Sequence, residues 1–347
     1  MAKTRVEQVV KDIRGRISSG EYAPHERIPS EVKLQEEYGV SGDTVRKALV
    51  RLTTEGAIYR LPWKGSFVSP PAKVGRILVV ANYATVVPAD NFGLLYGFSA
   101  FGHGMRCYED QHSVPYALIL MDRDTYMRSA YEIHLIHRDI AGIIFFRDVQ
   151  PVLATRPQLE QLGIPFLFYG SDRCREQLLG ENIYCYSEES LVSLALEYLT
   201  GKGHTKILCT RSDAVAGRYR IYEAWMRQRG LWSDDCGPIE IEDGRMMISP
   251  SELVKRGTAL LGARDKEAVV VLNAAVRAGI AVPESLAVMG IDNYPIGTHT
   301  VVPLTSVDIP IMEDAERCTQ LFIELLEGKR KTISERSRIR VVERESV

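Results

Sequence analysis

The stretch IPSEVKLQEEYGVSGDTVRKALVRLTTEGAI, residues 28–58, decides the fold of the N-terminal part of the chain. Ser30 and Ser41 each precede a short helical pattern, and a serine hydroxyl at that place accepts a hydrogen bond from a free backbone N–H. Gly39 separates the two patterns, and glycine readily adopts the left-handed backbone conformation that a tight turn requires. Two short helices that meet at such a turn are typical of a helix-turn-helix.

The segments on either side extend this unit to residues 1–69. A helix is expected over 5–19, because its apolar residues fall on one face at helical spacing. Two short strands near 57–60 and 66–68 are joined by residues 62–65, which predicts a hairpin of the kind called a wing. The N-terminal sequence therefore predicts a winged helix-turn-helix.

The distribution of charge agrees with DNA contact at this end. Residues 1–72 carry 12 Lys and Arg against 9 Asp and Glu, whereas the remainder carries 31 against 36. A basic head on an acidic body fits a nucleic-acid contact that is confined to the N-terminus.

A longer run, residues 13–68, resembles the winged helix-turn-helix of the GntR family. It reads IRGRISSGEYAPHERIPSEVKLQEEYGVSGDTVRKALVRLTTEGAIYRLPWKGSFV. The matching positions are I..G.Y.P...IPSE..L...YGVS..TVR.AL..L..EG.I.R...G.FV, in the order of the family pattern. The resemblance implies that this head binds double-stranded operator DNA.

The recognition helix of the head is expected to open at Ser41, which places its first turns near the DNA. Arg46 matches the arginine of the family's TVR motif, and we expect it to reach a guanine edge or a phosphate. Ser41 and Thr44 are expected to bind phosphates through their hydroxyls and the helix N-terminus. Asp43 in the same turn repels phosphate. The residues expected at the DNA are Ser30, Ser41, Asp43, Thr44, Arg46, Lys47, Lys64 and Gly65.

The wing tip fits the minor groove, because Gly65 allows close approach and Lys64 supplies positive charge. The neighbouring Trp63 is expected to pack under the wing, and contact with the sugar-phosphate backbone is the alternative. Many GntR proteins carry arginine where this chain has Val32 and Gly42. Each lost phosphate contact makes the slope of log K against log salt concentration shallower by about 0.9. Because two such contacts are absent here, weak binding or an atypical operator is expected.

Residues 70–75 contain two consecutive prolines and are expected to form an extended linker. From residue 76 onward apolar strand patterns alternate with helical ones, which predicts an α/β domain of two doubly wound parallel sheets over 76–347. The expected strands are 77–81, 117–121, 142–146, 165–169, 206–210, 258–261, 286–291 and 304–307. The expected helices include 191–199, 218–229, 266–278 and 311–326.

This second part resembles the effector domain of the LacI/GalR repressors. The segments that carry the resemblance are AGIIFF (141–146), LGIPFLF (162–168), ALEYLTGKGHTKILCT (195–210), GRYRIYEAW (217–225), AGIAVPESLAVMGIDN (278–293), PLTSV (303–307) and VVERES (341–346). The resemblance implies a periplasmic-binding-protein fold with two lobes around a cleft, a small-molecule effector and a homodimer. A GntR head on such a body is similar to the arabinose-repressor subfamily.

Two residues are the main candidates for binding the effector. Arg220 matches the family arginine that follows the fifth strand, and Asp292 in GIDN matches the aspartate at a strand end. Arg264, where many relatives carry an amide, suggests an acidic ligand such as a uronate or a sugar phosphate. The expected ligand contacts are Asn91, Phe92, Asp148, Ser171, Asp172, Arg220, Arg264 and Asp292. The helix that follows residue 92 is expected to be short.

The sequence excludes several other classes of function. It contains no phosphate-binding loop, nucleophile motif or metal-ligand spacing, so neither an enzyme nor a cofactor or metal site is expected. The first residues are charged, apolar runs are short, and the six cysteines are scattered, which together favour a cytoplasmic protein with reduced thiols.

The prediction is a ligand-responsive repressor of a carbohydrate-utilisation operon. The weighed alternatives are a regulator fused to an enzyme domain, a solute-binding protein of the cell envelope, and a winged-helix regulator whose body no longer binds sugar and acts through protein contacts.

Overall fold

The computed structural model describes residues 5–23, 25–61, 63–69, 75–82, 92–112, 114–128, 139–179, 182–211 and 216–347. It divides into two compact units, one of residues 1–75 with 109–117 and one of residues 76–108 with 118–347. We call residues 5–69 the head and the two sheets with their helices the body. The predicted linker, residues 70–75, lies almost entirely outside the described residues, so the boundaries 1–69, 70–75 and 76–347 stay a prediction.

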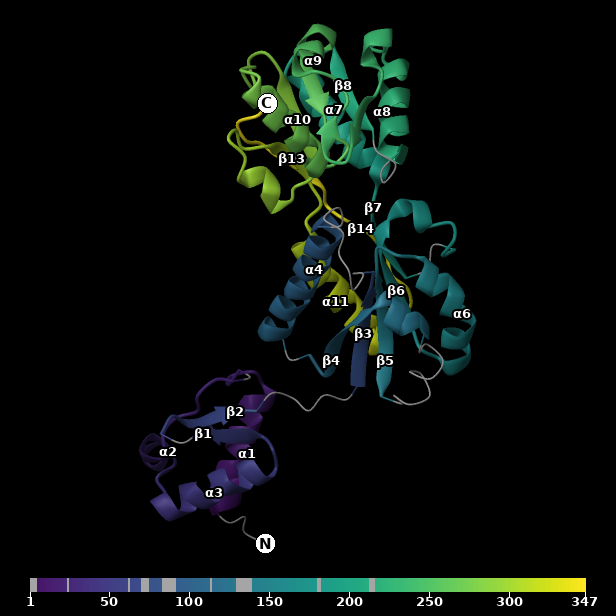
Figure 1. Ribbon diagram of the computed structural model, residues 1–347. Helices are drawn as coiled ribbons and strands as arrows, with labels where there is room; N and C mark the ends of the chain where they lie inside the picture. The colour runs from purple at the N-terminus through teal and green to yellow at the C-terminus, as the bar shows by residue number, and fades with distance from the viewer. Residues whose placement is uncertain are drawn as a thin grey trace. The chain divides into compact units, whose positions relative to one another are not determined.

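The head is a winged helix-turn-helix, as predicted (Figure 1). Ser30 and Ser41 are the N-caps of α2 and α3, and each side chain accepts a hydrogen bond from the backbone N–H three residues on. Gly39 ends α2 with φ +61°. The elements are α1 (Arg5–Ser18), α2 (Glu31–Tyr38), α3 (Gly42–Thr54), β1 (Ile58–Leu61) and β2 (Gly65–Val68).

One apolar core joins the three helices of the head to its wing. β1 and β2 pair antiparallel, with Ile58 opposite Val68, and the side chains of both residues point into this core. Its buried members are Val9, Val10, Ile13, Tyr22, Ile28, Leu34, Val45, Ala48, Leu49, Leu52, Ile58 and Val68. The helical faces predicted from apolar spacing are therefore the faces that pack.

The body contains two α/β lobes. In lobe 1 the strand order is β14-β7-β6-β5-β3-β4, and the pairings from β14 to β3 are parallel. Its strands are β3 (Gly75–Ala81), β4 (Tyr116–Asp122), β5 (Ile140–Phe146), β6 (Phe166–Ser171), β7 (Ile183–Tyr186) and β14 (Ser334–Arg336). Its helices are α4 (Phe92–Gln111), α6 (Gln150–Leu162) and α11 (Ile311–Leu326).

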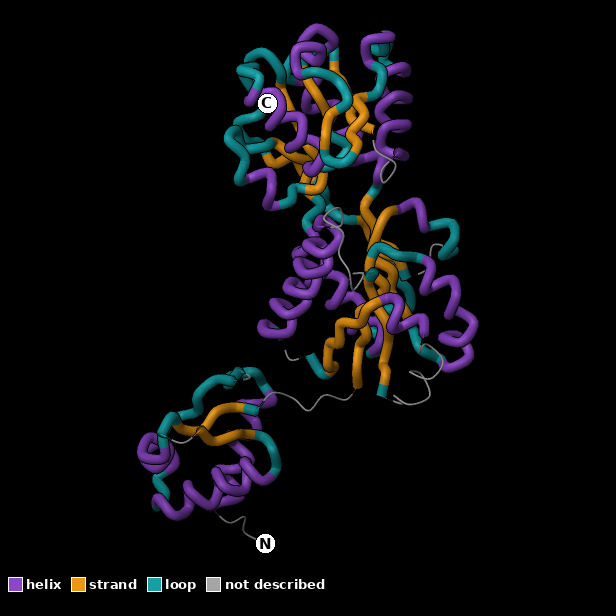
Figure 2. The backbone as a smooth tube through the Cα atoms, viewed as in Figure 1, coloured by secondary structure: helices purple, strands orange, loops and turns teal. Residues whose placement is uncertain are grey.

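Helices cover both faces of the lobe 1 sheet, as Figure 2 shows. Phe145 belongs to the core that α6 closes, whereas Phe146, the next residue of β5, packs against Phe101 of α4. Alternate residues of each strand thus face opposite layers, which explains why these strands read as continuous apolar runs.

In lobe 2 the strand order is β10-β9-β8-β11-β12-β13-β15, with parallel pairing from β9 to β13. Its strands are β8 (Ile207–Arg211), β9 (Ile239–Glu242), β10 (Arg245–Met246), β11 (Ala259–Leu261), β12 (Ala287–Asp292), β13 (Thr305–Asp308) and β15 (Arg340–Val342). Its helices are α7 (Glu188–Gly201), α8 (Ala216–Gln228), α9 (Pro250–Arg256) and α10 (Asp265–Arg277).

The chain passes between the lobes three times. It enters lobe 2 between β7 and α7, returns to lobe 1 between β13 and α11, and enters lobe 2 again between β14 and β15. These crossings place the carboxyl ends of β5, β7 and β12 in one region, which is where doubly wound sheets bind their ligands.

All eight predicted strands are present, but the sequence did not predict β7, β9, β10, β14 or β15. These strands have two to four residues each, and too few residues alternate to produce a pattern. The expectation of a short helix after residue 92 is wrong, because α4 has 20 residues. Its glycines lower intrinsic helix propensity, and packing against the sheet and α11 overrides that loss.

Gly104 of α4 makes a close contact that only glycine allows. A Cβ at Gly104 would lie 2.3 Å from the carbonyl oxygen of Met312 and 2.9 Å from the Cβ of Ala315, both in α11. Gly104→Ala is therefore expected to destabilise the body by about 1–3 kcal/mol. Gly102→Ala is the control, because its Cβ would only touch Leu120 at 3.4 Å, and it should gain up to about 1 kcal/mol of helix propensity. Urea unfolding that gave both variants the same sign would contradict this packing.

Candidate DNA interface and ligand cleft

The first turn of α3 presents a set of polar groups to solvent. The Ser41 hydroxyl caps the helix and lies 3.0 Å from the Thr44 hydroxyl. The side chains of Arg46 and Lys47 are 63% and 66% exposed. All sequence-predicted residues of the recognition helix therefore share one accessible end, and their contact with DNA stays a prediction.

Acidic neighbours hold both cations of this turn. Lys47 Nζ lies 2.8 Å from an Asp43 carboxylate oxygen, and Arg46 Nε lies 3.7 Å from Glu31 of α2. The Lys47 ammonium lowers the pKa of Asp43 below its usual value. Because DNA is an anion, Asp43 both repels it and competes for Lys47.

The wing tip corrects one expectation. Trp63 does not pack under the wing: it is fully exposed, with φ +65°. The rings of Tyr59 and Phe67 stack on each other there, 5.6 Å between centroids. Lys64 beside it is exposed, and Gly65 has φ +112°. The tip therefore presents an indole and an ammonium to solvent.

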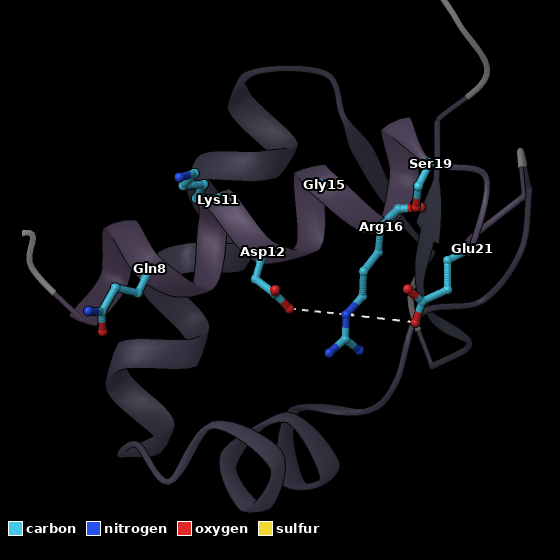
Figure 3. Close-up of a pocket in the computed structure, with 7 residues that line it drawn as sticks. All are labelled: Gln8, Lys11, Asp12, Gly15, Arg16, Ser19 and Glu21. Atoms are coloured by element: carbon cyan, nitrogen blue, oxygen red, sulfur yellow. Dashed lines mark hydrogen bonds and ion pairs between the residues drawn. The ribbon is translucent and has the colours of Figure 1, made fainter.

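The head also has a cavity along α1, which is lined by residues that join α1 to α2 (Figure 3). This cavity of about 600 Å³ contains none of the predicted DNA-contacting residues. Arg16 within it forms ion pairs with Asp12 at 3.0 Å and Glu37 at 2.6 Å, and donates a hydrogen bond to the Tyr22 hydroxyl. Since these partners use the guanidinium donors, the network connects α1 to α2 rather than offering a ligand site.

Asp43→Asn is expected to tighten DNA binding, because it removes a repulsive charge and frees Lys47. A gain of about threefold to tenfold follows if the lysine then forms one phosphate contact, with a salt dependence steeper by about 0.9. Fluorescence anisotropy at several salt concentrations measures both. Glu284→Gln is the charge-matched control on an exposed residue of the body. Unchanged or weaker binding by Asp43→Asn would contradict this role.

In the body, Arg218 of α8 is the centre of a buried ionic cluster. Its Nε donates to Glu188 at 2.6 Å, its Nη2 to Asp292 at 3.1 Å, and its Nη1 to the carbonyl of Ala263 at 2.7 Å. Burial alone lowers the pKa of Arg218, but the charges of Asp292 and Glu188 outweigh it and raise the pKa above its usual value. Arg218 therefore holds Asp292 at the end of β12.

Arg220, the arginine predicted from the sequence, is exposed on α8 and does not reach this cluster. The arginine of the cluster stands two residues earlier in the helix, and ligand contact by Arg220 stays a prediction. Two residues turn a helix by about 200°, so Arg218 and Arg220 face in nearly opposite directions. The inward face of α8 holds Tyr222, Trp225 and Met226, and counting back from them by helical spacing selects Arg218.

Arg147, which the sequence analysis did not select, carries unused hydrogen-bond donors in the cleft. It follows β5 with φ +60°, a backbone conformation that is costly for a long side chain. Its Nη1 donates to the Tyr294 hydroxyl at 3.3 Å, but Nε and Nη2 are buried without a hydrogen-bond partner. The guanidinium also lies 5.4 Å from the Phe146 ring centroid and 5.2 Å from that of Tyr186.

Asp265 positions the loop that carries Asp292. Its carboxylate accepts hydrogen bonds from the backbone N–H of Tyr294 and from the Ser306 hydroxyl, both at 2.6 Å. This fixes a turn in which Asp292 has φ +108° and Asn293 has φ +53°. Burial raises the pKa of Asp265 to about 8, with a further contribution from the charge of Asp292. The role of Asp265 is not evident from the sequence, because an aspartate in the first turn of a helix is common whether it is buried or exposed.

The other predicted ligand residues have local partners. Asp148 accepts from the N–H of Gln150 and pairs with Arg123 at 3.3 Å. Ser171 caps a short helical turn at Asp172–Cys174, and Asp172 accepts weakly from the N–H of Glu188.

Arg264 forms an ion pair with the buried Glu267. The acidic-ligand expectation based on Arg264 therefore loses its support, because this charge is already neutralised. Asn91 lies outside the described residues, and Phe92 begins α4 without a described side chain.

A cavity of about 190 Å³ lies beside Asp292 at the side of the cleft. Its lining includes Tyr96 of α4, Asp308 and Arg340. Arg340 is paired with Asp308 and Glu313, so its charge is already neutralised. Ligand pockets usually measure about 300–1,000 Å³, so only a small ligand fits without movement of the lobes.

Among the described residues, no group of three or more His, Cys, Asp and Glu side chains is placed to hold a metal ion. Within the same ranges, no helix combines the length and apolar character needed to span a bilayer.

Comparison with known families agrees with both parts of the fold. The model for bacterial regulatory proteins of the gntR family matches residues 5–68, and the model for the periplasmic binding protein-like domain matches residues 196–347. The chain has a GntR-family head and a periplasmic-binding-protein-like body. The two matches coincide with the helix-turn-helix and wing and with most of lobe 2.

Two relatives are similar to this chain over most of its length. The arabinose metabolism transcriptional repressor of Geobacillus stearothermophilus is 24% identical over 346 residues, covering 93% of this chain and 91% of the relative. That of Halalkalibacterium halodurans is 23% identical and covers 95% and 91%. A solved complex of the transcriptional regulator CelR with cellobiose has a TM-score of 0.56 at 18% identity and covers 89% of this chain and 92% of that one.

Arg218→Met is expected to destabilise the body by about 3–5 kcal/mol, because it leaves Glu188 and Asp292 as buried charges without their partner. Arg220→Met is the matched control on the same helix and should stay within about 0.5 kcal/mol of the wild type. Urea unfolding followed by circular dichroism measures both variants. Equal stability of the two would show that the cluster is not the buried ion pair described.

Proposed function

We propose that this protein is a ligand-responsive transcriptional repressor. The GntR-family head binds operator DNA, and the body binds a sugar or sugar derivative that changes this binding. The observation that carries the proposal is the presence in one chain of an exposed recognition helix and of buried Arg147 nitrogen atoms without a hydrogen-bond partner after β5.

The head supports the DNA-binding part through the end of α3 and the wing. Both Ser41 and Thr44 offer hydroxyls beside a helix N-terminus, which suits a phosphate. Arg46 is long enough to reach a base edge once it leaves Glu31, an exposed pair that contributes little stability. We infer that Ser30, Lys47, Lys64 and Gly65 complete this surface.

The cleft supports the ligand-binding part through a complementary pair of groups. Arg147 offers donors, and Asp292 offers carboxylate oxygens that accept from hydroxyls. A sugar hydroxyl both donates and accepts, so one ligand satisfies both residues. The aromatic rings of Tyr186 and Tyr294 near Arg147 supply the apolar surface that a sugar ring needs.

We infer that the protein acts as a homodimer in the cytoplasm on adjacent genes for carbohydrate use. Two heads on one palindromic operator gain effective concentration over a single head. The names of these similar proteins make arabinose and cellobiose the first sugars to test.

The proposal is tested with a duplex from the region upstream of the protein's own gene. Anisotropy titrations are run with the full chain alone and with arabinose, cellobiose, galacturonate or glucose 6-phosphate at millimolar concentration. A change of about fivefold to 150-fold in DNA affinity with one of them is expected. Binding of the duplex without any response to sugars or sugar acids would favour the alternative in which the body acts through protein contacts.

Arg147→Met and Asp292→Asn are expected to keep DNA binding and to lose about 1–3 kcal/mol of ligand affinity each, because a ligand polar atom is left unpaired. Isothermal titration with the responding sugar measures that loss. Arg220→Met is the control, because it has the same charge change as Arg147→Met on an exposed residue. If Arg220→Met loses the response and Arg147→Met retains it, the ligand site is elsewhere.

A further inference from the structure

Trp63 is an exposed aromatic residue that the stability of the head does not explain. Its side chain is fully exposed at the tip between β1 and β2, whereas Trp225 in the body is 6% exposed. Its φ of +65° is the left-handed conformation, which a large side chain rarely adopts. Both the exposure and the backbone conformation cost free energy, and such strain persists where it serves function.

The surroundings of Trp63 fit a polyanion. Lys64 follows it and has no ion pair among the described residues, and Leu61 before the tip is 40% exposed. Arg27 lies alongside the tip, because a Cβ on Gly65 would be 2.9 Å from its Nε. An apolar ring flanked by two cations matches a groove with anionic walls and stacked bases between them.

We propose that the Trp63 indole is a wedge that enters the minor groove of duplex DNA and partly unstacks one base step. The inference rests on the DNA binding proposed above and adds what the wing recognises. Apolar wedges that enter the minor groove kink the duplex, and pyrimidine–purine steps such as TA unstack most easily. The wing therefore reads the deformability of a step, which partly offsets the absence of arginine at Val32 and Gly42.

The described contacts of the wing do not involve the Trp63 side chain. Tyr59 and Phe67 stack on the face of the hairpin opposite to the one that Ile58 and Val68 turn to the core, and Trp63 is not part of that core. Lys64 N–H donates to the Leu61 carbonyl at 3.1 Å, which closes the turn without any contribution from the indole. Removal of the ring leaves the hairpin intact.

The test uses the full chain and two 30-base-pair duplexes of equal composition, one alternating T and A and one a homopolymeric A-tract. The alternating duplex has TA steps and the A-tract has none. Trp63→Ala is expected to weaken binding to the alternating duplex about tenfold, the range of one lost stacking contact, and to weaken binding to the A-tract less than about twofold, because its steps do not unstack. Its salt dependence stays that of the wild type.

Lys64→Gln is the neighbouring control, and it should weaken both duplexes equally and lower the salt slope by about 0.9. Wild-type tryptophan emission should be quenched by the alternating duplex, and Trp63→Phe should lack that quenching. Energy transfer between dyes on the duplex ends should show a bend with the wild type and none with Trp63→Ala. Trp63→Gly, which suits the positive φ, should bind as weakly as Trp63→Ala without a lower thermal midpoint, which separates lost contact from unfolding.

The outcomes separate this inference from the proposed function. If the wild type binds neither these duplexes nor its own upstream region, DNA binding itself is wrong. If the wild type binds and Trp63→Ala binds and bends both duplexes equally well, the wedge is wrong and the repressor remains. If Trp63→Ala makes the slope of log K against log salt concentration shallower, as Lys64→Gln does, the ring contacts the sugar-phosphate backbone of the DNA. That result would also overturn the wedge.

Discussion

The ion cluster around Arg218 is the interaction on which the body depends. One buried guanidinium serves two carboxylates, Glu188 at the start of α7 and Asp292 at the end of β12. Burial raises the pKa of Asp292, and the positive charge of Arg218 opposes that rise while its Nη2 holds the carboxylate in position. The same guanidinium binds the carbonyl of Ala263 after β11. Three segments of lobe 2 are thereby held together at the edge of the sheet where we propose that the ligand binds.

Arginines whose hydrogen-bond donors have partners differ in role from Arg147, two of whose donors have none. Arg218 and Arg264 have their donors directed at carboxylates, and a ligand gains little from them. Arg147 has two buried nitrogen atoms without hydrogen-bond partners. Burial of such donors costs free energy unless an acceptor, such as a ligand oxygen, binds them. Arg218 and Arg264 therefore position other protein groups, whereas Arg147 has donors left for a ligand. All three residues carry the same charge, so charge alone does not show this difference.

The same distinction applies in the head. Lys47 is held by Asp43 and Arg46 is near Glu31, so the recognition helix presents cations that are partly neutralised. Lys64 and the exposed Trp63 at the wing tip have no such partners among the described residues. For the DNA contact that we propose, the wing tip therefore offers a cation that is less neutralised than those of the recognition helix.

The sequence by itself determined the winged helix-turn-helix, its caps at Ser30 and Ser41, and the alternation that builds two parallel sheets. These features depend on the spacing of apolar and capping residues within short segments, which the sequence shows directly. It did not determine the short strands β7, β9, β10, β14 and β15, whose pairing partners are distant in sequence. Nor did it distinguish Arg218 from Arg220, or the free Arg147 from the paired Arg264. Whether a charged side chain is free or neutralised depends on neighbours from other segments, and only the tertiary structure decides which neighbours those are.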